Sequence, residues 1–81
     1  MTKEQILNRL HENFIDSEIE VQDMTGQSNH FNLLIISNDF KSVSLIKRHK
    51  MIHSIFKLEL TTEIHAFQIK ALTPAEWRNK K

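Results

Sequence analysis

The sequence of 81 residues predicts an α+β fold in which helices pack on a three-stranded mixed sheet. Apolar residues recur at helical spacing in two segments, alternate with polar residues in a third, and occupy both faces of a fourth. Followed by a further strand and a short helix, these four segments give the element order α-β-β-α-β-α. Because the chain carries no internal repeat and no linker-like stretch, we expect a single domain spanning residues 1–81.

The first two strands are expected to follow an N-terminal helix. Thr2 and Gln5 match a capping box, and the apolar residues after them recur at helical spacing: Ile6, Leu7, Leu10 and Phe14. Residues 18–22 alternate between polar and apolar types, which is typical of a strand with one buried face. Residues 30–37 are apolar on both faces, as in a central strand. The loop between them is short and contains Gly26, so these strands should pair antiparallel.

A long helix should follow, capped by Ser42 or Ser44 and running to about Leu60. One face of this helix is expected to be buried, and its members are Leu45, His49, Ile52 and Phe56. The opposite, solvated face should carry Lys47, Lys50, Ser54 and Lys57. The last strand, residues 63–72, should then lie parallel to the central strand, because a helix joins the two through a right-handed crossover.

A short helix should close the chain. Thr73 and Glu76 match a second capping box, and Pro74 suits the first helical position. Trp77 is expected to fold back as a hydrophobic anchor.

The composition limits the chemistry that the chain can perform. It has no cysteine, so iron or zinc would have to be held by histidine or carboxylate, or by sulfur from a partner. No apolar run approaches the roughly 18 residues of a membrane span, and no signal pattern opens the chain, so we expect no membrane partner and a cytoplasmic location. A nucleophile elbow, a cofactor loop and a converging acid–base pair are all missing, so we do not expect an enzyme.

Two histidines are candidates for metal binding. His30 opens the second strand and His65 opens the third. If these strands are parallel neighbours about 4.8 Å apart, both imidazoles lie at the same end of the sheet, beside the loop with Gly26. Two imidazoles form an incomplete coordination sphere, and a lone strand histidine is more often a packed residue bonded to backbone than a ligand.

Three segments of the chain resemble the BolA family: Arg48-His49-Lys50-Met51-Ile52, Ile64-His65-Ala66-Phe67, and Leu72-Thr73-Pro74-Ala75-Glu76-Trp77. The resemblance extends from about Ile6 to Trp77 and implies a fold similar to a class II KH domain. It also implies a heterodimer with a monothiol glutaredoxin, in which a [2Fe–2S] cluster is shared with the glutaredoxin cysteine and glutathione. His65 matches the family's cluster ligand, and His30 is the candidate for the second. Alone, the chain is expected to hold no cofactor. The implied role is iron–sulfur cluster maturation or iron regulation.

The resemblance also implies that Arg48, His49 and Lys50 lie close to the glutaredoxin-facing surface. For His49, a half-buried histidine packed on the sheet is the favoured alternative. Lys47, Arg48, Lys50 and Lys57 form a basic stripe, which is usually a solvated helix face. It could also attract the negative charge of the cluster and glutathione.

The alternative function is a KH-like DNA-binding transcriptional regulator, for which Lys47, Arg48 and Lys50 are the candidate contacts. A KH domain clamps nucleic acid with a Gly-x-x-Gly loop, and this chain has only one glycine. With a net charge of +1, nucleic-acid binding is expected to be weak. The chain also departs from the family at Ser42-Val43, where glycine is common after Asp39-Phe40-Lys41. The turn there should use a different conformation, or Ser42 should cap the helix.

Overall fold

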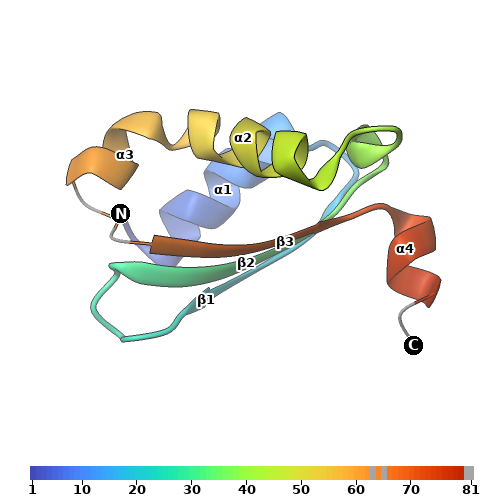
Figure 1. The fold of residues 1–81 in the computed structure, drawn as a ribbon. Helices are drawn as coiled ribbons and strands as arrows, with labels where there is room; N and C mark the ends of the chain where they lie inside the picture. The colour runs from blue at the N-terminus through green and yellow to red at the C-terminus, as the bar shows by residue number, and fades with distance from the viewer. Residues whose placement is uncertain (63, 65, 80–81) are drawn as a thin grey trace.

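The computed structural model describes residues 1–62, 64 and 66–79. Its three strands form one sheet, and helices α1, α2 and α3 cover one face of that sheet, while α4 lies beyond the end of β3 (Figure 1). In chain order the elements are α1 (Lys3–Asn13), β1 (Glu18–Asp23), β2 (His30–Ile36), η1 (Asn38–Phe40), α2 (Leu45–Ile55), α3 (Lys57–Thr62), β3 (Ala66–Leu72) and α4 (Pro74–Asn79). The α+β class and the α-β-β-α-β-α order are confirmed, with the long helix divided into α2 and α3.

The sheet has the predicted topology, with strand order β1-β2-β3. β1 pairs antiparallel with β2 so that Glu18 faces Ile36, and β2 pairs parallel with β3 so that His30 faces Ala66. β2 is the central strand and the most apolar of the three: Phe31, Leu33 and Ile35 are buried on the face that the helices cover, and Ile36 is buried on the other. This register fixes which residues of the three strands lie side by side.

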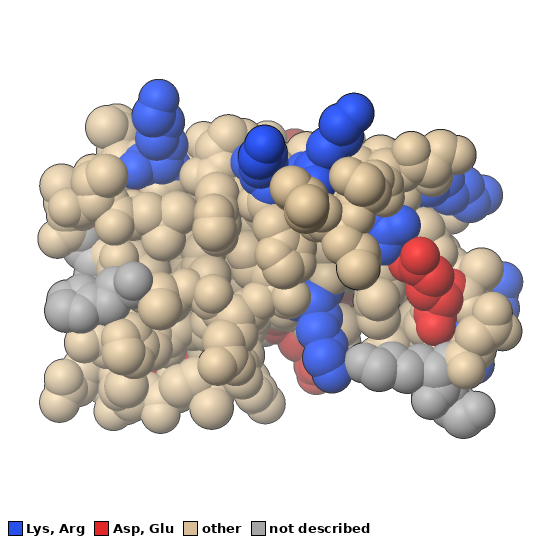
Figure 2. All heavy atoms as spheres, viewed as in Figure 1, with Lys and Arg blue, Asp and Glu red and all other residues tan. Residues whose placement is uncertain are grey.

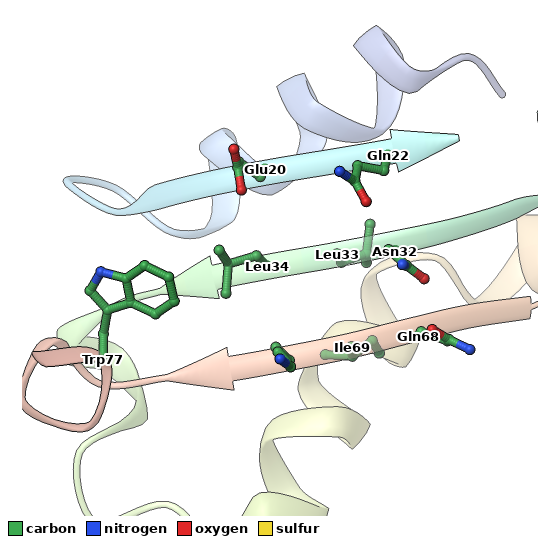
Figure 3. A pocket seen from close by; sticks show the side chains of 9 residues that line it. Glu20, Gln22, Asn32, Leu33, Leu34, Gln68, Ile69 and Trp77 are labelled. Carbon is green, nitrogen blue, oxygen red and sulfur yellow. The ribbon is translucent and has the colours of Figure 1, made fainter. Parts of the chain in front are cut away.

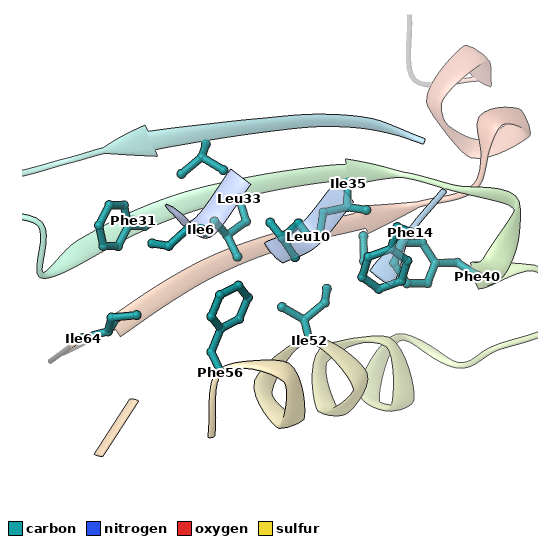
Figure 4. Close-up of a cluster of buried hydrophobic side chains, with 12 residues drawn as sticks. Ile6, Leu10, Phe14, Phe31, Leu33, Ile35, Phe40, Ile52, Phe56 and Ile64 are labelled. Atoms are coloured by element: carbon teal, nitrogen blue, oxygen red, sulfur yellow. The ribbon is translucent and has the colours of Figure 1, made fainter. Parts of the chain in front are cut away.

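The core lies between the sheet and the covering helices (Figure 4). α1 contributes Ile6, Leu10 and Phe14, and the predicted capping box at its start is present, with Gln5 N–H donating to Thr2 Oγ1 at 3.2 Å. Aromatic rings pack between the helices and the sheet. The centre of the Phe56 ring lies 5.2 Å from the centre of the Phe67 ring in β3. An edge-to-face arrangement of this kind adds to the stabilisation that burial alone provides.

The buried face of the long helix differs from the prediction. Leu45 is 63% exposed and His49 is exposed, so the predicted stripe of Leu45, His49, Ile52 and Phe56 is wrong in its first half. Arg48, expected in the exposed basic stripe, is only 5% exposed. The helix also ends earlier, because α2 stops at Ile55 and a second short helix, α3, begins at Lys57. Between them lies Phe56, whose fully buried ring packs against Phe67.

The turn into α2 distinguishes the two candidate caps. Ser44 is the N-cap, since its hydroxyl accepts a hydrogen bond from Lys47 N–H at 3.2 Å. Ser42 is not the cap and has φ +60°, a left-handed conformation. Glycine adopts this region without steric cost, whereas a side chain with a Cβ is disfavoured there. Ser42 therefore occupies a position that suits glycine.

The predicted start of α4 is confirmed. Thr73 N–H donates to Glu76 Oε1 at 2.8 Å, and Glu76 N–H donates to Thr73 Oγ1 at 3.2 Å, which completes a capping box. Trp77 is half-buried and lies beside Leu34 on the face of the sheet away from the helices. Among the described residues, no helix is long and apolar enough to span a bilayer.

Candidate functional site

His30 is the described member of the predicted histidine pair. It begins β2, is exposed to solvent, and faces Ala66, the first residue of β3, across the parallel pairing. The carbonyl of Asn29 accepts a hydrogen bond from Ala66 N–H at 3.3 Å, so the starts of the two strands are joined directly. His65, the other member, lies outside the described residues, and Ala66 follows it in the chain. The structure therefore brings His30 to the start of β3.

The loop before His30 is organised by a carboxylate that the sequence analysis did not single out, that of Asp23. Asp23 Oδ1 accepts hydrogen bonds from Thr25 N–H and Gly26 N–H, and Oδ2 accepts one from Ser28 N–H at 3.0 Å. Both carboxylate oxygens thus bond to loop backbone. An Asp followed by turn-forming residues is the signal that could have identified this arrangement.

Two further bonds close the same loop. Met24 N–H donates to the carbonyl of His30 at 2.9 Å, and Thr25 Oγ1 donates to Asn29 Oδ1 at 2.6 Å. Gly26 and Ser28 both have positive φ, which the tight path requires. These hydrogen bonds therefore fix the conformation of the loop and, with it, the position of His30.

A small hollow of about 160 Å³ opens beside His30. It is lined by Met24, His30, Phe31, Asn32, Ala66 and Gln68. Within residues 1–62, 64 and 66–79, no three His, Asp or Glu side chains converge as a metal site would require. The described part of this end of the sheet consequently offers one exposed imidazole and an open surface next to it.

The exposed side of α2 combines basic and apolar side chains. From residue 40 to residue 58 the chain has no acidic residue, and its basic residues there are Lys41, Lys47, Arg48, Lys50 and Lys57. Figure 2 shows Lys and Arg atoms rising along the rim where Figure 1 places α2 and α3. Ile46 and Leu58 are 70% and 76% exposed on the same two helices. We call the exposed set Leu45, Ile46, Lys47, His49 and Lys50 the α2 surface.

Arg48 does not belong to the α2 surface. Its guanidinium donates to the carbonyls of Val43 and Ala71, each at 2.9 Å, and to both carboxylate oxygens of Glu76 at 2.6 and 3.2 Å. It also lies 5.6 Å from the centre of the Phe40 ring. The hydrogen bond from Arg48, followed by the one from Thr73 N–H, lowers the pKa of Glu76 to about 2. Arg48 therefore joins α2, β3 and α4.

A second ion pair joins the first and third helices. Arg9 Nη1 lies 2.9 Å from Glu59 Oε1 and donates to the carbonyl of Ile55 at 3.4 Å. The Arg9 guanidinium also lies 5.3 Å from the centre of the Phe56 ring. The hydrogen bond from Arg9 holds the pKa of Glu59 below its usual value. This contact secures the short helix α3 just before β3.

Comparison with known proteins agrees with this architecture. The family model described as BolA-like protein matches residues 4–76. Mouse BolA-like protein 1 is 38% identical over 53 residues, which cover 65% of this chain and 39% of the mouse protein. A Haemophilus influenzae protein named DNA-binding transcriptional regulator BolA is also 38% identical over 53 residues, covering 65% of this chain and 52% of that protein. The matched segment thus spans about half or less of these relatives.

Solved structures extend the likeness to the whole sheet. The BolA domain of SufE1 from Arabidopsis thaliana superposes with a TM-score of 0.83 and 38% sequence identity, over 91% of this chain and 93% of that one. The family model spans all three strands, the helices α2 and α3, and α1 except for its first residue. The chain belongs to the BolA family.

Proposed function

We propose that this chain is an accessory protein that binds a monothiol glutaredoxin and shares a [2Fe–2S] cluster with it, serving iron–sulfur cluster maturation or iron regulation. The chain itself would catalyse no reaction. The observation that carries the proposal is the position of His30, exposed at the end of the sheet and in register with Ala66, the residue after His65. Membership of the BolA family supports the choice of partner.

The donor set fits a cluster held jointly with a partner. With no cysteine and no converging group of three ligands among the described residues, the chain offers imidazole nitrogen and leaves the remaining positions to a partner. His65 and His30 would hold the cluster, and the Asp23-bonded loop would keep His30 in place. When bound, the cluster supplies one-electron redox chemistry at a potential raised by neutral imidazole ligands. Only the neutral form of an imidazole can act as a metal ligand.

The α2 surface is the second part of the proposal. Lys47 and Lys50 lie on an exposed helix face that has no acidic neighbour along α2, and Leu45 and Ile46 add exposed apolar area beside them. A cluster with a glutathione ligand carries negative charge, which this surface would attract during docking. Arg48 would contribute only by holding α2 against α4, because its guanidinium is buried.

The proposal is tested by titrating the protein into a cluster-loaded monothiol glutaredoxin homodimer and following visible circular dichroism. We expect a new spectrum with a one-to-one end point. His65→Ala should abolish it and His30→Ala should alter it, whereas His53→Ala, which removes an exposed histidine of α2, should leave it unchanged. A homodimer spectrum that is unaffected by the wild-type protein would reject the proposal.

A second candidate function is DNA binding. The name of the Haemophilus influenzae relative favours it, as do the exposed lysines Lys47, Lys50 and Lys57. Because phosphate contacts release counterions, DNA affinity would fall steeply with salt, and each lysine replaced by glutamine would reduce that slope. Arg48→Gln would act on stability instead, since its guanidinium does not reach the surface.

A further inference from the structure

The face of the sheet away from α1, α2 and α3 carries a hollow of about 470 Å³ (Figure 3). Its volume is within the range typical of small-molecule sites. Outward-facing residues of all three strands line it, and the indole of Trp77 from α4 closes one end beside Leu34. The hollow is distinct from the α2 surface, which lies on the helical side of the molecule.

The strand register arranges the polar side chains of this hollow in two rows. Gln22, Asn32 and Gln68 face one another across the three strands and form a row of carboxamides. In the next row, two positions along, Leu34 lies between Glu20 of β1 and Lys70 of β3. Since neighbouring strands are about 4.8 Å apart, the backbones of Glu20 and Lys70 are about 10 Å apart.

One polar atom in the amide row has no partner within the protein. Asn32 Oδ1 is buried and accepts no hydrogen bond, and it is the one such atom among the buried side chains that the structure describes. Leaving a buried acceptor unpaired is unfavourable. The Asn32 side chain as a whole is partly exposed, so a rotation of its carboxamide would turn Oδ1 toward the hollow, where an N–H group of a ligand would supply the missing donor.

We propose that this hollow binds a short zwitterionic peptide of two or three residues. Its ammonium group would pair with Glu20 and its carboxylate with Lys70, while its backbone amides would lie over the carboxamide row and donate to Asn32 Oδ1. An apolar side chain of the ligand would pack against Leu34 and Trp77. An extended peptide spans at most about 3.3–3.6 Å per residue, so two or three residues match the separation of the two charged strands.

The charges of the hollow select this class over others. Glu20 and Lys70 carry opposite charge and both line the hollow, so a simple anion or a simple cation meets one attractive and one repulsive group. A segment within a longer protein lacks the two free termini that the pair would bind. A dipolar molecule with amide groups satisfies the carboxylate, the ammonium and the unpaired acceptor together.

The fluorescence of the protein provides a direct measurement. Trp77 is the only tryptophan and the chain has no tyrosine, so the emission comes from a side chain that lines this hollow. We would titrate glycyl-leucine, its N-acetyl form, its C-terminal amide and the doubly blocked peptide. The zwitterion should give a saturable change and bind about two- to fivefold more tightly than each singly blocked form, because exposed ion pairs contribute modestly.

Three variants assign the contacts. In Glu20→Gln, glycyl-leucine should no longer bind more tightly than its N-acetyl form. In Lys70→Gln, it should no longer bind more tightly than its C-terminal amide. Asn32→Leu should weaken all four peptides, and it should raise the Tm of the free protein because it removes the unpaired acceptor. Glu12→Gln is the control, since it removes an exposed carboxylate of α1, on the other side of the sheet from the hollow.

Two results would overturn the proposal. One is the absence of a saturable change in Trp77 emission with glycyl-leucine up to roughly 10 mM, well above the Kd of a weak small-ligand site. The other is equal affinity for the zwitterion and the doubly blocked peptide, which would show that the free termini are not recognised.

Discussion

Arg48 of α2 and Glu76 of α4 form a two-point ion pair across the end of the sheet, with distances of 2.6 and 3.2 Å between guanidinium nitrogens and carboxylate oxygens. The same guanidinium donates to the carbonyl of Ala71 in β3. The same carboxylate accepts from Thr73 N–H at the start of α4. One buried cation thus fixes the orientation of the C-terminal helix, and with it the indole of Trp77.

Replacing Arg48 with methionine should destabilise the fold. Methionine fills much of the same volume but leaves the buried carbonyl of Ala71 and the half-buried carbonyl of Val43 without their donor, and an unsatisfied buried acceptor is costly. We expect the free energy of unfolding to fall by about 2–4 kcal/mol in urea denaturation. Lys57→Met, which removes an exposed cation, should change it by less than about 0.5 kcal/mol. Equal stability of the Arg48 variant and wild type would show that the network contributes nothing.

The stability of the protein should depend on pH through Glu76. Its pKa is about 2 in the folded protein, lowered from 4.5. Between these values the unfolded state binds more protons, so this contribution is fully present above pH 4.5 and is lost as the pH falls toward 2. Glu59 adds to the same trend because its pKa is also lowered.

Glu76→Gln isolates that contribution. Urea denaturation between pH 2.5 and pH 6, a range chosen to span roughly the two pKa values, should give a flatter stability curve for the variant than for wild type. The two proteins should be closest in stability at the acidic end. Parallel curves across this range would rule out the ion pair as the source of the dependence.

Ser42→Gly should stabilise the protein. Ser42 has φ +60°, where a Cβ is disfavoured and glycine is not. Part of the relief is offset by the greater entropy of glycine in the unfolded chain, so the expected gain is about 0.5–1 kcal/mol. Thermal unfolding provides the measurement. Ser44→Ala, which removes the N-cap of α2, should lower stability by about 1 kcal/mol, and a loss of stability in Ser42→Gly would contradict the strain argument.

Asp23→Ala should loosen the loop before His30. The variant loses the acceptors of the Gly26 and Ser28 amides, so these two amides should exchange with solvent faster in hydrogen-exchange NMR. Amides of α1 should keep their protection because the loop lies outside the core. Asp39→Ala, which removes an exposed carboxylate from the turn after β2, serves as the control. Unchanged protection of Gly26 and Ser28 would show that the loop does not depend on the carboxylate.

Most of the fold follows from local patterns, and the caps show why. Thr2, Ser44 and Thr73 act on backbone groups within three residues, so a short sequence window contains all the information needed. The central strand was equally clear, since only β2 is apolar on both faces. These signals survive in the folded protein because tertiary packing reinforces them.

The face of α2 could not be predicted in the same way. Arg48 is buried because its partners come from β3, α4 and the turn at Val43, and spacing along the helix does not show them. The helical spacing therefore predicted an exposed Arg48 and a buried His49, and the structure has the reverse. The break between α2 and α3 lies at Phe56, whose ring packs against Phe67 in a later strand, a contact that spacing along the helix likewise does not show.

The candidate site was predictable in position. The start of β2 and the start of β3 lie together, as parallel pairing required. The Asp23 network was not predicted, because its donors are backbone amides that become available only when Gly26 and Ser28 take positive φ. The assignment of His65 and His30 as cluster ligands stays a prediction.

Histidine ligation of a shared cluster is the central claim, and pulsed EPR tests it most directly. The protein would be labelled with ¹⁵N-histidine, mixed with the cluster-loaded glutaredoxin, and reduced to the paramagnetic state. The proposal predicts strong ¹⁵N couplings from imidazole, reduced in His30→Ala and lost when His65 is also replaced by alanine. A stable mixed complex whose reduced cluster shows no histidine nitrogen coupling would contradict it.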